Sequence, residues 1–594
     1  MKPFALLLVA LCVTAPNASA ETYPSWPIVV APGDQTNPRH AASRVFWMDG
    51  RDSTGADLYF SYERALYDTP QPFVAAPQWQ YDFRIAPEDG YSSPGTSCGF
   101  GGNPIPGFTL PLSMVVWVDG RSGDLDLRVK PDGIGQGWPG VDIPLCSAPG
   151  FQTDPRIVLA AYTQGSDSLS WIVGWLDRRN GTDRHVYAQR LTSVVSTVTA
   201  NWTPDGVPVC IVPDFCSDLG MVADGAGGAY LVWKQETGGI HVQRITDAGV
   251  PAPGWPVNGL AVSGATAVTA SQPWVVSDGA GGILVAWNDL RATGSPADAD
   301  IYAQHVNGSG AVASGWPVSG LPVTTAFQDQ QLAGLVTDNS GGAIAVWEDG
   351  RNRQFEELSP NYDVRALRIT GAGGVAPGWN ADGTVVCDRP FAQSNATAIN
   401  DGAAGVYIAW EDRDGPELAP DIRASHLQGD GQLPSTWPAG GEDGVVICDV
   451  AGAQTMPSVG YMCNFLLVAW VDERNAATTG KDIYAVSMSP FGRVDVGDIR
   501  PAALALGAPR PNPARVGSST HLDLPEATTV EASIADLAGR RVTSLVRGER
   551  WEAGAHELRW DGRDAGGTAV PTGIYFLHVR TGASSAVRRI VLMR

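Results

Sequence analysis

An apolar run that ends in tryptophan and continues into aspartate and arginine returns along most of this chain at intervals of roughly sixty residues. One clear copy is GGILVAWNDLR at 281–291, and the eight copies are centred on Trp47, Trp117, Trp175, Trp233, Trp287, Trp347, Trp410 and Trp470. The copy around Trp233, LVWKQET, lacks the aspartate and the arginine. A repeat of this length predicts that one small structural unit is built many times in succession.

Each unit carries further signals that predict four short β-strands. A second tryptophan motif, such as GWP at 254–256, alternates with the first. A glycine turn such as DGAGG at 278–282 precedes the apolar run, and glycine tolerates the positive φ of tight hairpins. A β-rich segment such as DIYAQH at 300–305 follows the run, and helical periodicity is almost absent.

The run in each unit is apolar on both faces of the predicted strand. Such a strand, for example residues 283–287, suits a sheet that is packed between two neighbouring sheets. Repetition of these sheets predicts an all-β fold with an eight-bladed β-propeller across residues 21–500. A seven-bladed ring is the alternative, because the unit before Trp117 is long and poor in markers, and an open solenoid is the main rival architecture.

The N-terminal segment is expected to close this ring. WPIVV at 26–30 has the pattern of the last strand of a unit, whereas the final unit stops after its third strand near Ser489. We therefore expect residue 26 to lie beside residue 485, where it would remove an exposed sheet edge.

The turns after the apolar runs carry the candidate site residues. Loops at this end of the units vary most in length, as at 352–362 and 90–107, which favours this end as an interaction face. One interpretation is a polar ring that binds sugars, a peptide or a cation. The other is a set of local turn caps, which repetition in nearly every unit favours because a catalytic centre needs asymmetry. The candidates are Asp49, Arg51, Asp119, Arg121, Asp177, Arg179, Asp289, Arg291, Asp349, Arg351, Asp412, Asp472 and Arg474.

Enzyme and cofactor motifs are absent from the sequence. It lacks G-x-S-x-G, H-E-x-x-H, phosphate-loop and dinucleotide fingerprints, and its tryptophan spacing differs from that of sialidase Asp boxes. Glu356, Glu357, Asp363 and Glu417 could serve as paired carboxylates of a glycosidase. We expect no cofactor, although Asp-rich stretches at 49–57 and 296–300 could offer oxygens to Ca²⁺ without the spacing of a known calcium loop.

Charge and the first residues narrow the partners and the location. A formal net charge of -22 repels phosphate backbones, so nucleic acid is not an expected partner. Lys2, the apolar run 4–13 and the small residues before Glu21 predict a secretory signal peptide at 1–20. No later segment is apolar for long enough to span a membrane. We expect a monomer that is secreted or attached to the outer-membrane surface.

Cysteine positions predict disulfides between units. Cys146, Cys210 and Cys387 each lie eight residues after a tryptophan of the second motif, and Cys448 lies eleven residues after one. Cys146 with Cys210 and Cys387 with Cys448 are therefore candidate pairs. Cys210 with Cys216 is a local rival, and reduced cysteines are the third alternative.

From about residue 501 the repeat stops and a different module, 501–594, begins. Alternating stretches such as THLDL at 520–524 and IYFLHVR at 574–580 predict about seven strands of a small β-sandwich. The ordered motifs of residues 504–594 resemble the FlgD-type immunoglobulin-like domain, and in particular the type A C-terminal sorting domain of the type IX secretion system. PNPAR stands where PNPF is frequent in that family. These motifs are PNP at 511–513, DLAGR at 536–540, HELRWDGRD at 556–564, GIYF at 573–576 and RRIVLMR at 588–594.

The resemblance implies export in two steps. The signal peptide would carry the chain across the inner membrane, and an outer-membrane translocon of the type IX system would recognise residues 504–594. A retained stalk or adhesive domain is the alternative role of this module. The sequence thus predicts non-enzymatic binding of a glycan or protein at the cell surface, with a secreted carbohydrate-active hydrolase or lyase as the alternative.

Overall fold

The structure of the chain is a computed structural model. It describes residues 26–29, 34–41, 44–49, 57–62, 83–84, 113–120, 123–132, 143–163, 168–194, 197–264, 270–292, 294–295, 298–352, 361–413, 419–435, 437, 443–462, 465–488, 505–506, 514, 517–524, 528–537, 540–551, 554–582 and 585–593. The predicted signal peptide and the predicted boundary at residue 500 lie outside these residues.

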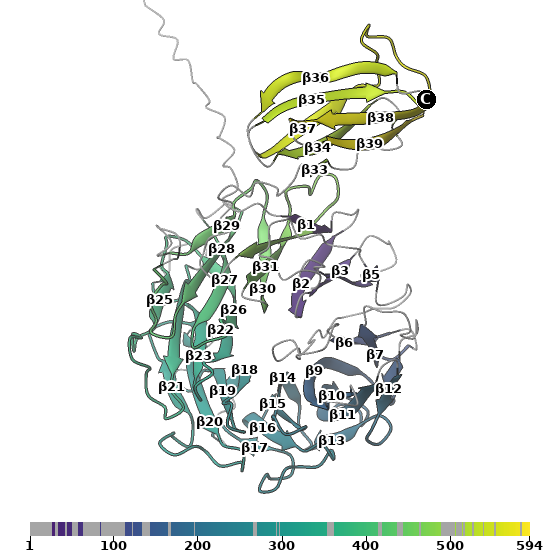
Figure 1. Cartoon of the computed structure of the whole chain (residues 1–594). Coiled ribbons are helices and arrows are strands. Elements are labelled where there is room, and N and C mark those ends of the chain that lie inside the picture. The colour runs from purple at the N-terminus through teal and green to yellow at the C-terminus, as the bar shows by residue number, and fades with distance from the viewer. Residues whose placement is uncertain are drawn as a thin grey trace, which may run out of the picture. The chain divides into compact units, whose positions relative to one another are not determined.

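Eight antiparallel sheets succeed one another along the described part of the repeat region (Figure 1). The first holds β2 (Gln35–Ala41), β3 (Arg44–Asp49), β4 (Asp57–Tyr62) and β5 (Phe83–Arg84), and the second holds β6 (Ser113–Asp119), β7 (Asp126–Asp132) and β8 (Ile143–Cys146). The third holds β9 (Gln152–Thr163), β10 (Ser168–Asp177), β11 (His185–Val194), β12 (Thr197–Ala200) and β13 (Val207–Cys210), and the fourth holds β14 (Cys216–Ala223), β15 (Ala229–Gln235), β16 (Gly239–Ile245) and β17 (Leu260–Ala261).

The remaining four sheets follow the same plan. The fifth holds β18 (Ala270–Ser277), β19 (Ile283–Asp289), β20 (Asp300–Val306) and β21 (Leu321–Thr324), and the sixth holds β22 (Gln330–Thr337), β23 (Ala343–Asp349), β24 (Asp363–Ile369) and β25 (Thr384–Cys387). The seventh holds β26 (Gln393–Asn400), β27 (Val406–Asp412), β28 (Asp421–Leu427) and β29 (Val445–Cys448), and the eighth holds β30 (Gln454–Met462), β31 (Phe465–Asp472), β32 (Asp482–Met488) and β1 (Trp26–Val29). The predicted eight-bladed propeller is confirmed.

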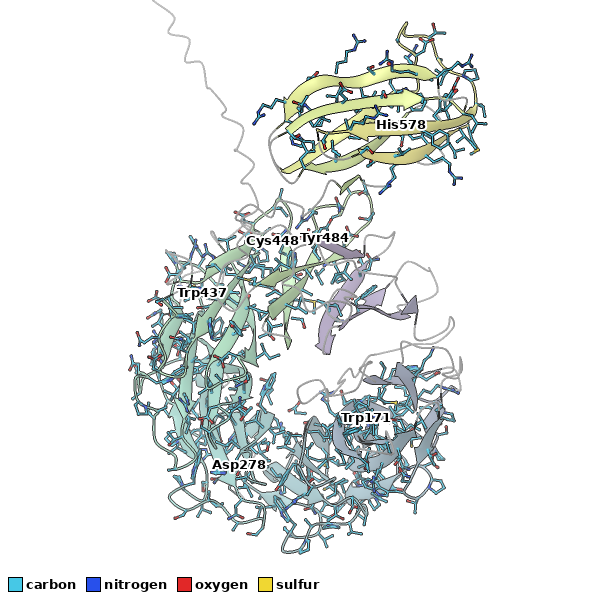
Figure 2. All side chains as sticks on the ribbon, in the orientation of Figure 1. Trp171, Asp278, Trp437, Cys448, Tyr484 and His578 are labelled. Carbon is cyan, nitrogen blue, oxygen red and sulfur yellow. The ribbon has the colours of Figure 1, made fainter. Side chains whose placement is uncertain are left out.

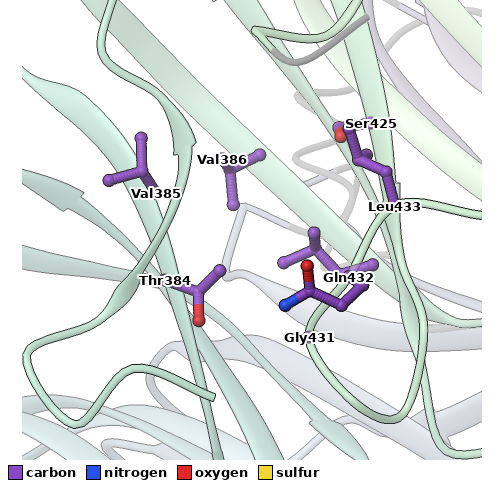
Figure 3. A pocket seen from close by; sticks show the side chains of 8 residues that line it. Thr384, Val385, Val386, Ser425, Gly431, Gln432 and Leu433 are labelled. Atoms are coloured by element: carbon purple, nitrogen blue, oxygen red, sulfur yellow. The ribbon is translucent and has the colours of Figure 1, made fainter. Parts of the chain in front are cut away.

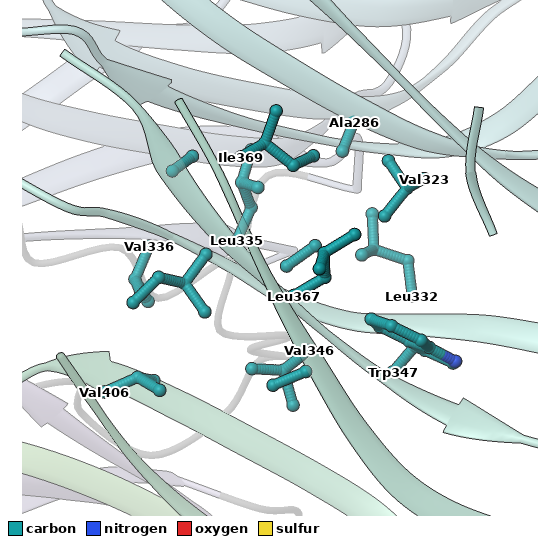
Figure 4. Close-up of a cluster of buried hydrophobic side chains, with 14 of the residues drawn as sticks. Ala286, Val323, Leu332, Leu335, Val336, Val346, Trp347, Leu367, Ile369 and Val406 are labelled. Atoms are coloured by element: carbon teal, nitrogen blue, oxygen red, sulfur yellow. The ribbon is translucent and has the colours of Figure 1, made fainter. Parts of the chain in front are cut away.

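The second strand of each sheet is buried because both of its faces pack against neighbouring sheets. In β23, residues Ala343 to Trp347 are at most 1 % exposed. Their side chains share one apolar cluster with Ala286 of the fifth sheet and Val406 of the seventh (Figure 4). The prediction from the doubly apolar runs is therefore correct. Gly383, with φ +88°, lets the chain cross the ring of Trp347, since a Cβ there would lie 2.5 Å from the indole.

The first strands of the sheets lie on the inner side of the ring (Figure 1). They contact one another in succession, β9 with β14, then β18, β22, β26, β30 and β2. In the second sheet the described strands begin with β6, which carries Trp117 and Asp119 and therefore corresponds to the second strand of the other sheets.

The N-terminal strand completes the last sheet as expected. β1 pairs with β32 in antiparallel register, with Trp26 opposite Ala485. Ile28 packs into an apolar cluster that joins the last sheet to the first through Val45, Trp47 and Val471. The first strand of the chain thus occupies the edge that β32 would otherwise expose.

The recurring glycine turn and the recurring GWP motif each have a structural explanation. In the DGAGG turn, Asp278 Oδ1 accepts hydrogen bonds from the backbone N–H groups of Ala280 and Gly282. Trp255 of the GWP motif donates its Nε1–H to the carbonyl oxygen of Gly308 in the next sheet, at 3.1 Å. The aspartate of the glycine turn therefore caps a hairpin, whereas the tryptophan of the GWP motif links neighbouring sheets.

The C-terminal strands form the predicted sandwich in a separate compact unit. One sheet holds β33 (Ala505–Leu506), β34 (Ser518–Leu524) and β37 (Gly554–Trp560), and the other holds β36 (Arg541–Trp551), β35 (Thr528–Ala535), β38 (Gly573–Arg580) and β39 (Ser585–Leu592). A single apolar core joins them and includes Trp560 and Tyr575.

The two disulfides predicted from the tryptophan spacing, Cys146 with Cys210 and Cys387 with Cys448, are wrong. No disulfide bond joins the described cysteines, which are Cys146, Cys210, Cys216, Cys387 and Cys448, and all five are buried. The four cysteines of the two predicted pairs occupy the ends of the outer strands β8, β13, β25 and β29, so each faces the sheet that follows it and not another cysteine of the same set. Cys146 Sγ, for example, lies 3.5 Å from a guanidinium nitrogen of Arg179 in the third sheet.

Candidate functional site

The recurring tryptophan, aspartate and arginine form one bonded group at the edge of a sheet. In the sixth sheet, Asp349 Oδ2 accepts a hydrogen bond from Trp347 Nε1 at 2.8 Å, and Oδ1 accepts one from the backbone N–H of Arg351 at 3.0 Å. The Arg351 guanidinium donates to both carboxylate oxygens at 2.7 and 2.8 Å. The motif thus satisfies a buried indole N–H and a buried carboxylate at once.

The same bonds recur in three other sheets, at Trp175, Asp177 and Arg179, at Trp287, Asp289 and Arg291, and at Trp470, Asp472 and Arg474. Their guanidinium groups also stack on tyrosines of the third strands, 3.9 to 4.0 Å from the ring centroids of Tyr187, Tyr302 and Tyr484 (Figure 2 labels Tyr484). Asp119 pairs with Arg128, and Asp412 pairs with Arg423. The side chain of Asp49, and Arg51 and Arg121, lie outside the described residues.

This geometry accounts for these carboxylates as local caps, the second of the two interpretations, while their role as a binding ring stays a prediction. The six described carboxylates are at most 5 % exposed, and internal donors already occupy them. Local capping, which requires the same bonds in every unit, accounts for the repetition.

The inner strands present a second, exposed set of polar residues. Near the start of most inner strands the pairing is irregular, and one residue that is not glycine adopts φ of +51° to +54°. Such a β-bulge turns the side chain of its extra residue away from the sheet. Sequence reasoning missed these positions because the residue type varies from unit to unit. They are Asn37, Asp154, Asp218, Gln272, Asn395 and Met456, and all but Asn37 are exposed.

Trp274 stands two residues beyond the bulge of β18 and is 43 % exposed. It is the most exposed tryptophan in the described part of the chain. Register places Trp274 opposite Ala286, and the equivalent residues of the two flanking inner strands are Gly220, opposite Val232, and Gly334, opposite Val346. No side chain from either equivalent position covers the indole.

A series of side chains from the third and fourth sheets leads to the strand of this tryptophan. Asp218 Oδ2 accepts a hydrogen bond from the backbone N–H of Gln272 at 3.3 Å. Arg184 lies 3.8 Å from Asp154 and stacks on Phe215, with its Cζ 4.5 Å from the ring centroid. We call Asp154, Arg184, Phe215, Asp218, Gln272 and Trp274 the inner-strand patch.

One signal in the sequence could have found the centre of this patch. Four of the 20 tryptophans fall outside both repeat motifs, namely Trp171, Trp274, Trp551 and Trp560. Trp171 and Trp560 are buried, and Trp551 lies in the sandwich. Trp274 is the one on an inner strand, where the repeat gives no reason for a large aromatic residue.

Two glutamates stand apart from the repeating aspartates. Burial raises the pKa of Glu348 to about 7, and the nearby charge of Glu411 acts in the same direction. Their carboxylates nevertheless accept hydrogen bonds from backbone N–H groups of the following sheet, Glu348 from Ala396 at 3.0 Å and Glu411 from Met456 at 2.8 Å. They link neighbouring sheets, as Asn288 does by accepting from the backbone N–H of Leu332.

The acids predicted for a glycosidase are not brought together in the described residues. Glu356, Glu357 and Glu417 lie outside them. Asp363 is 1 % exposed, and its Oδ2 accepts a hydrogen bond from Asn352 at 2.7 Å. Burial raises the pKa of Asp363 to about 6.

A hollow of about 310 Å³ opens between the sixth and seventh sheets (Figure 3). Its lining includes Thr384, Val386, Ser425, Gln432 and Leu433. None of its lining residues is a carboxylate, an imidazole or a cation, so the hollow offers no acid or base.

The described side chains give no support for a metal site. No three His, Cys, Asp or Glu side chains converge on a metal position among the described residues. Most of the Asp-rich stretch 49–57 and part of 296–300 lie outside them, so calcium binding there stays a prediction.

Fold and sites define the class of protein as an all-β chain that joins an eight-bladed propeller to an immunoglobulin-like sandwich. Residues 516–585 of the sandwich match the family of the FlgD Ig-like domain. No curated protein sequence matches the chain. In the described part of the chain, no helix has the length and apolar character needed to cross a membrane.

Several solved structures are similar at low identity. A protein of unknown function from Dyadobacter fermentans is 14 % identical, with a TM-score of 0.30, and the match covers 56 % of this chain and 93 % of that one. PorZ, a surface component of the type IX secretion system of Porphyromonas gingivalis, is 11 % identical, with a TM-score of 0.25 and coverage of 95 % and 74 %. The polysaccharide lyase Uly1 is 8 % identical, with a TM-score of 0.33 and coverage of 80 % and 94 %. Similarities at this level carry no argument about function.

Proposed function

We propose that this protein is a non-enzymatic binding protein of the bacterial surface that recognises a neutral glycan through the inner-strand patch. The observation that carries the proposal is the exposed indole of Trp274 between two glycine positions. A soluble protein has no packing reason to place a large aromatic side chain there, and exposed apolar groups with polar surroundings mark interaction sites.

The chemistry of the patch suits a sugar. A sugar ring has an apolar C–H face, which can stack on an indole, and a rim of hydroxyl groups, which need donors and acceptors. Asp154, Asp218 and Gln272 supply acceptors, while Arg184 and Gln272 supply donors. A net charge of -22 disfavours an acidic polysaccharide, so a neutral glycan is the occupant that the charges favour.

We expect Trp274→Ala to weaken binding of the preferred glycan by about five- to thirty-fold, because stacking of an aromatic ring contributes on the order of 1–2 kcal/mol. A glycan array with the full chain identifies the ligand, and titration calorimetry measures Kd. Trp274→Phe keeps a stacking face and should lose only a few-fold. Trp551→Ala removes an indole from the sandwich and should leave Kd unchanged.

Two results would contradict the glycan proposal. The first is a wild-type chain that binds no sugar on the array, which would favour a protein partner. The second is a Trp274→Ala chain with unchanged Kd.

A carbohydrate-active hydrolase or lyase is the second candidate, and the raised pKa of Glu348 beside Glu411 is the observation that favours it. A carboxyl group that titrates near pH 7 can act as a general acid. In that case the bound glycan is cleaved, and Glu348→Gln abolishes product release. Binding without any reducing-sugar or unsaturated product favours our proposal instead.

We further propose that the type IX translocon recognises residues 504–594 and delivers the chain to the outside of the cell. The match of 516–585 to the FlgD Ig-like domain and the basic final strand support this role. When residues 504–594 and a signal peptide are fused to a reporter in a bacterium with this secretion system, we expect the reporter at the cell surface or in the medium. Equal export of a reporter without those residues would contradict the role.

A further inference from the structure

We propose that Cys210 and Cys216 close a disulfide bond that joins the third sheet of the propeller to the fourth. Cys210 ends β13, the outer strand of the third sheet, and Cys216 begins β14, the inner strand of the fourth. Both side chains are 0 % exposed and share one apolar cluster. The backbone N–H of Cys216 donates to the carbonyl oxygen of Arg184, two residues before Val186, which pairs with Cys210 in the sheet. The two cysteines therefore lie side by side, as unbonded thiols in this structure, and each acts on the pKa of the other.

The fourth sheet lacks the aspartate–arginine pair that in two other sheets contacts a cysteine of the preceding sheet. In the third sheet, the Arg179 guanidinium holds Asp177 and also reaches Cys146 at the end of the preceding outer strand. In the eighth sheet, Arg474 holds Asp472 and reaches Cys448, at 3.2 Å, in the same way. The fourth sheet has Gln235 and Thr237 in place of this aspartate and arginine.

The fourth sheet also differs from most others in the first residue of its inner strand. This residue is a fully buried glutamine in five sheets, Gln35, Gln152, Gln330, Gln393 and Gln454, and it is Cys216 in the fourth. The sheet that lacks the ion pair is therefore the sheet that brings a second cysteine to the cysteine of the preceding outer strand. A disulfide bond would link the third and fourth sheets at the place where the aspartate–arginine pair is missing.

The oxidation needs a disulfide as electron acceptor. Both thiols are fully buried in the folded chain, so the exchange takes place during folding, before the two sheets pack. Either cysteine can then attack first, here Cys210. Its thiolate attacks oxidised glutathione, one glutathione leaves as a thiol, and Cys216 then displaces the second glutathione from Cys210. One S–S bond is broken and one is formed, and the two protons and two electrons of the cysteines pass to two glutathione thiols.

The test is refolding of the full chain from urea with reduced and oxidised glutathione, and in parallel with a reducing agent. Remaining thiols are alkylated in denaturant, and the chain is cut before Asp214, which lies between the two cysteines. We expect the oxidised chain to lose two alkylatable thiols, and the peptides that carry Cys210 and Cys216 to stay joined until they are reduced. We also expect the oxidised chain to melt at a higher temperature than its reduced form.

Matched variants assign the bond. Cys387→Ser should keep the linked peptides, whereas Cys216→Ser should lose both the link and the difference in melting temperature. Wild-type chain in which Cys210 and Cys216 are both fully alkylated after oxidative refolding overturns the proposal, and so does a link from Cys210 to Cys146. Because these two readouts come from the wild-type chain, they decide the matter even when a variant fails to fold.

Discussion

Replacement of Asp349 by alanine is expected to lower the free energy of unfolding of the propeller by about 3–5 kcal/mol. Asp349 is 0 % exposed and accepts hydrogen bonds from the Trp347 indole and from Arg351. Its removal leaves a buried indole N–H without an acceptor and leaves the largely buried Arg351 guanidinium with only the exposed Asp382 as its partner, and both losses are costly. Urea unfolding, followed by tryptophan fluorescence, measures the loss.

The chain offers a matched control on the same arginine. Asp382 also accepts a hydrogen bond from Arg351, at 2.8 Å, but its side chain is 75 % exposed. Asp382→Ala should therefore cost less than about 1 kcal/mol, as exposed ion pairs do. Equal losses in the two variants would show that burial of Asp349 is not what makes the recurring motif stabilising.

Deletion of residues 26–29 is expected to open the last sheet and to lower the unfolding free energy of the propeller by about 3 kcal/mol or more. The deletion removes the backbone pairing of β1 with β32 and takes Ile28 out of the cluster with Trp47 and Val471. An unpaired outer edge on β32 would also favour aggregation.

Amide hydrogen exchange provides the direct measurement of this closure. Residues 482–488 should lose protection in the shortened chain, whereas β19 in the fifth sheet should keep most of its own. A synthetic peptide of residues 24–31 should restore protection of β32. Unchanged exchange in β32 after the deletion would mean that the N-terminal strand does not close the ring.

Much of the architecture could be predicted from the sequence because short stretches within each repeat specify its strands and turns. Residues 283–287 are apolar on both faces, so they required a sheet on each side, and β19 is buried in that way. The Asp278 turn needed only a hairpin and a short acceptor, both of which are local. The pairing of Trp26 with Ala485 was predictable because the last unit lacked its fourth strand.

The site could not be predicted in the same manner. Asp349 and Asp472 look like exposed loop acids in the sequence, since nothing local shows that an indole and a guanidinium enclose them. The bulges at Asp154, Asp218 and Gln272 follow no common residue type, so no pattern marks them. Their exposure depends on how the inner strands pack against one another.

The sequence by itself determined the repeated unit, the number of sheets, the strand that completes the ring and the presence of a second module, because periodic apolar runs and turn residues act over short stretches of chain. The tertiary structure alone decided which polar side chains face inward and which face solvent. Trp274 became a candidate binding residue only when its strand lay between Gly220 and Gly334, and Cys216 met Cys210 only when the third and fourth sheets packed together. Burial and neighbours set the chemistry of a side chain, and both depend on residues that are distant in the sequence.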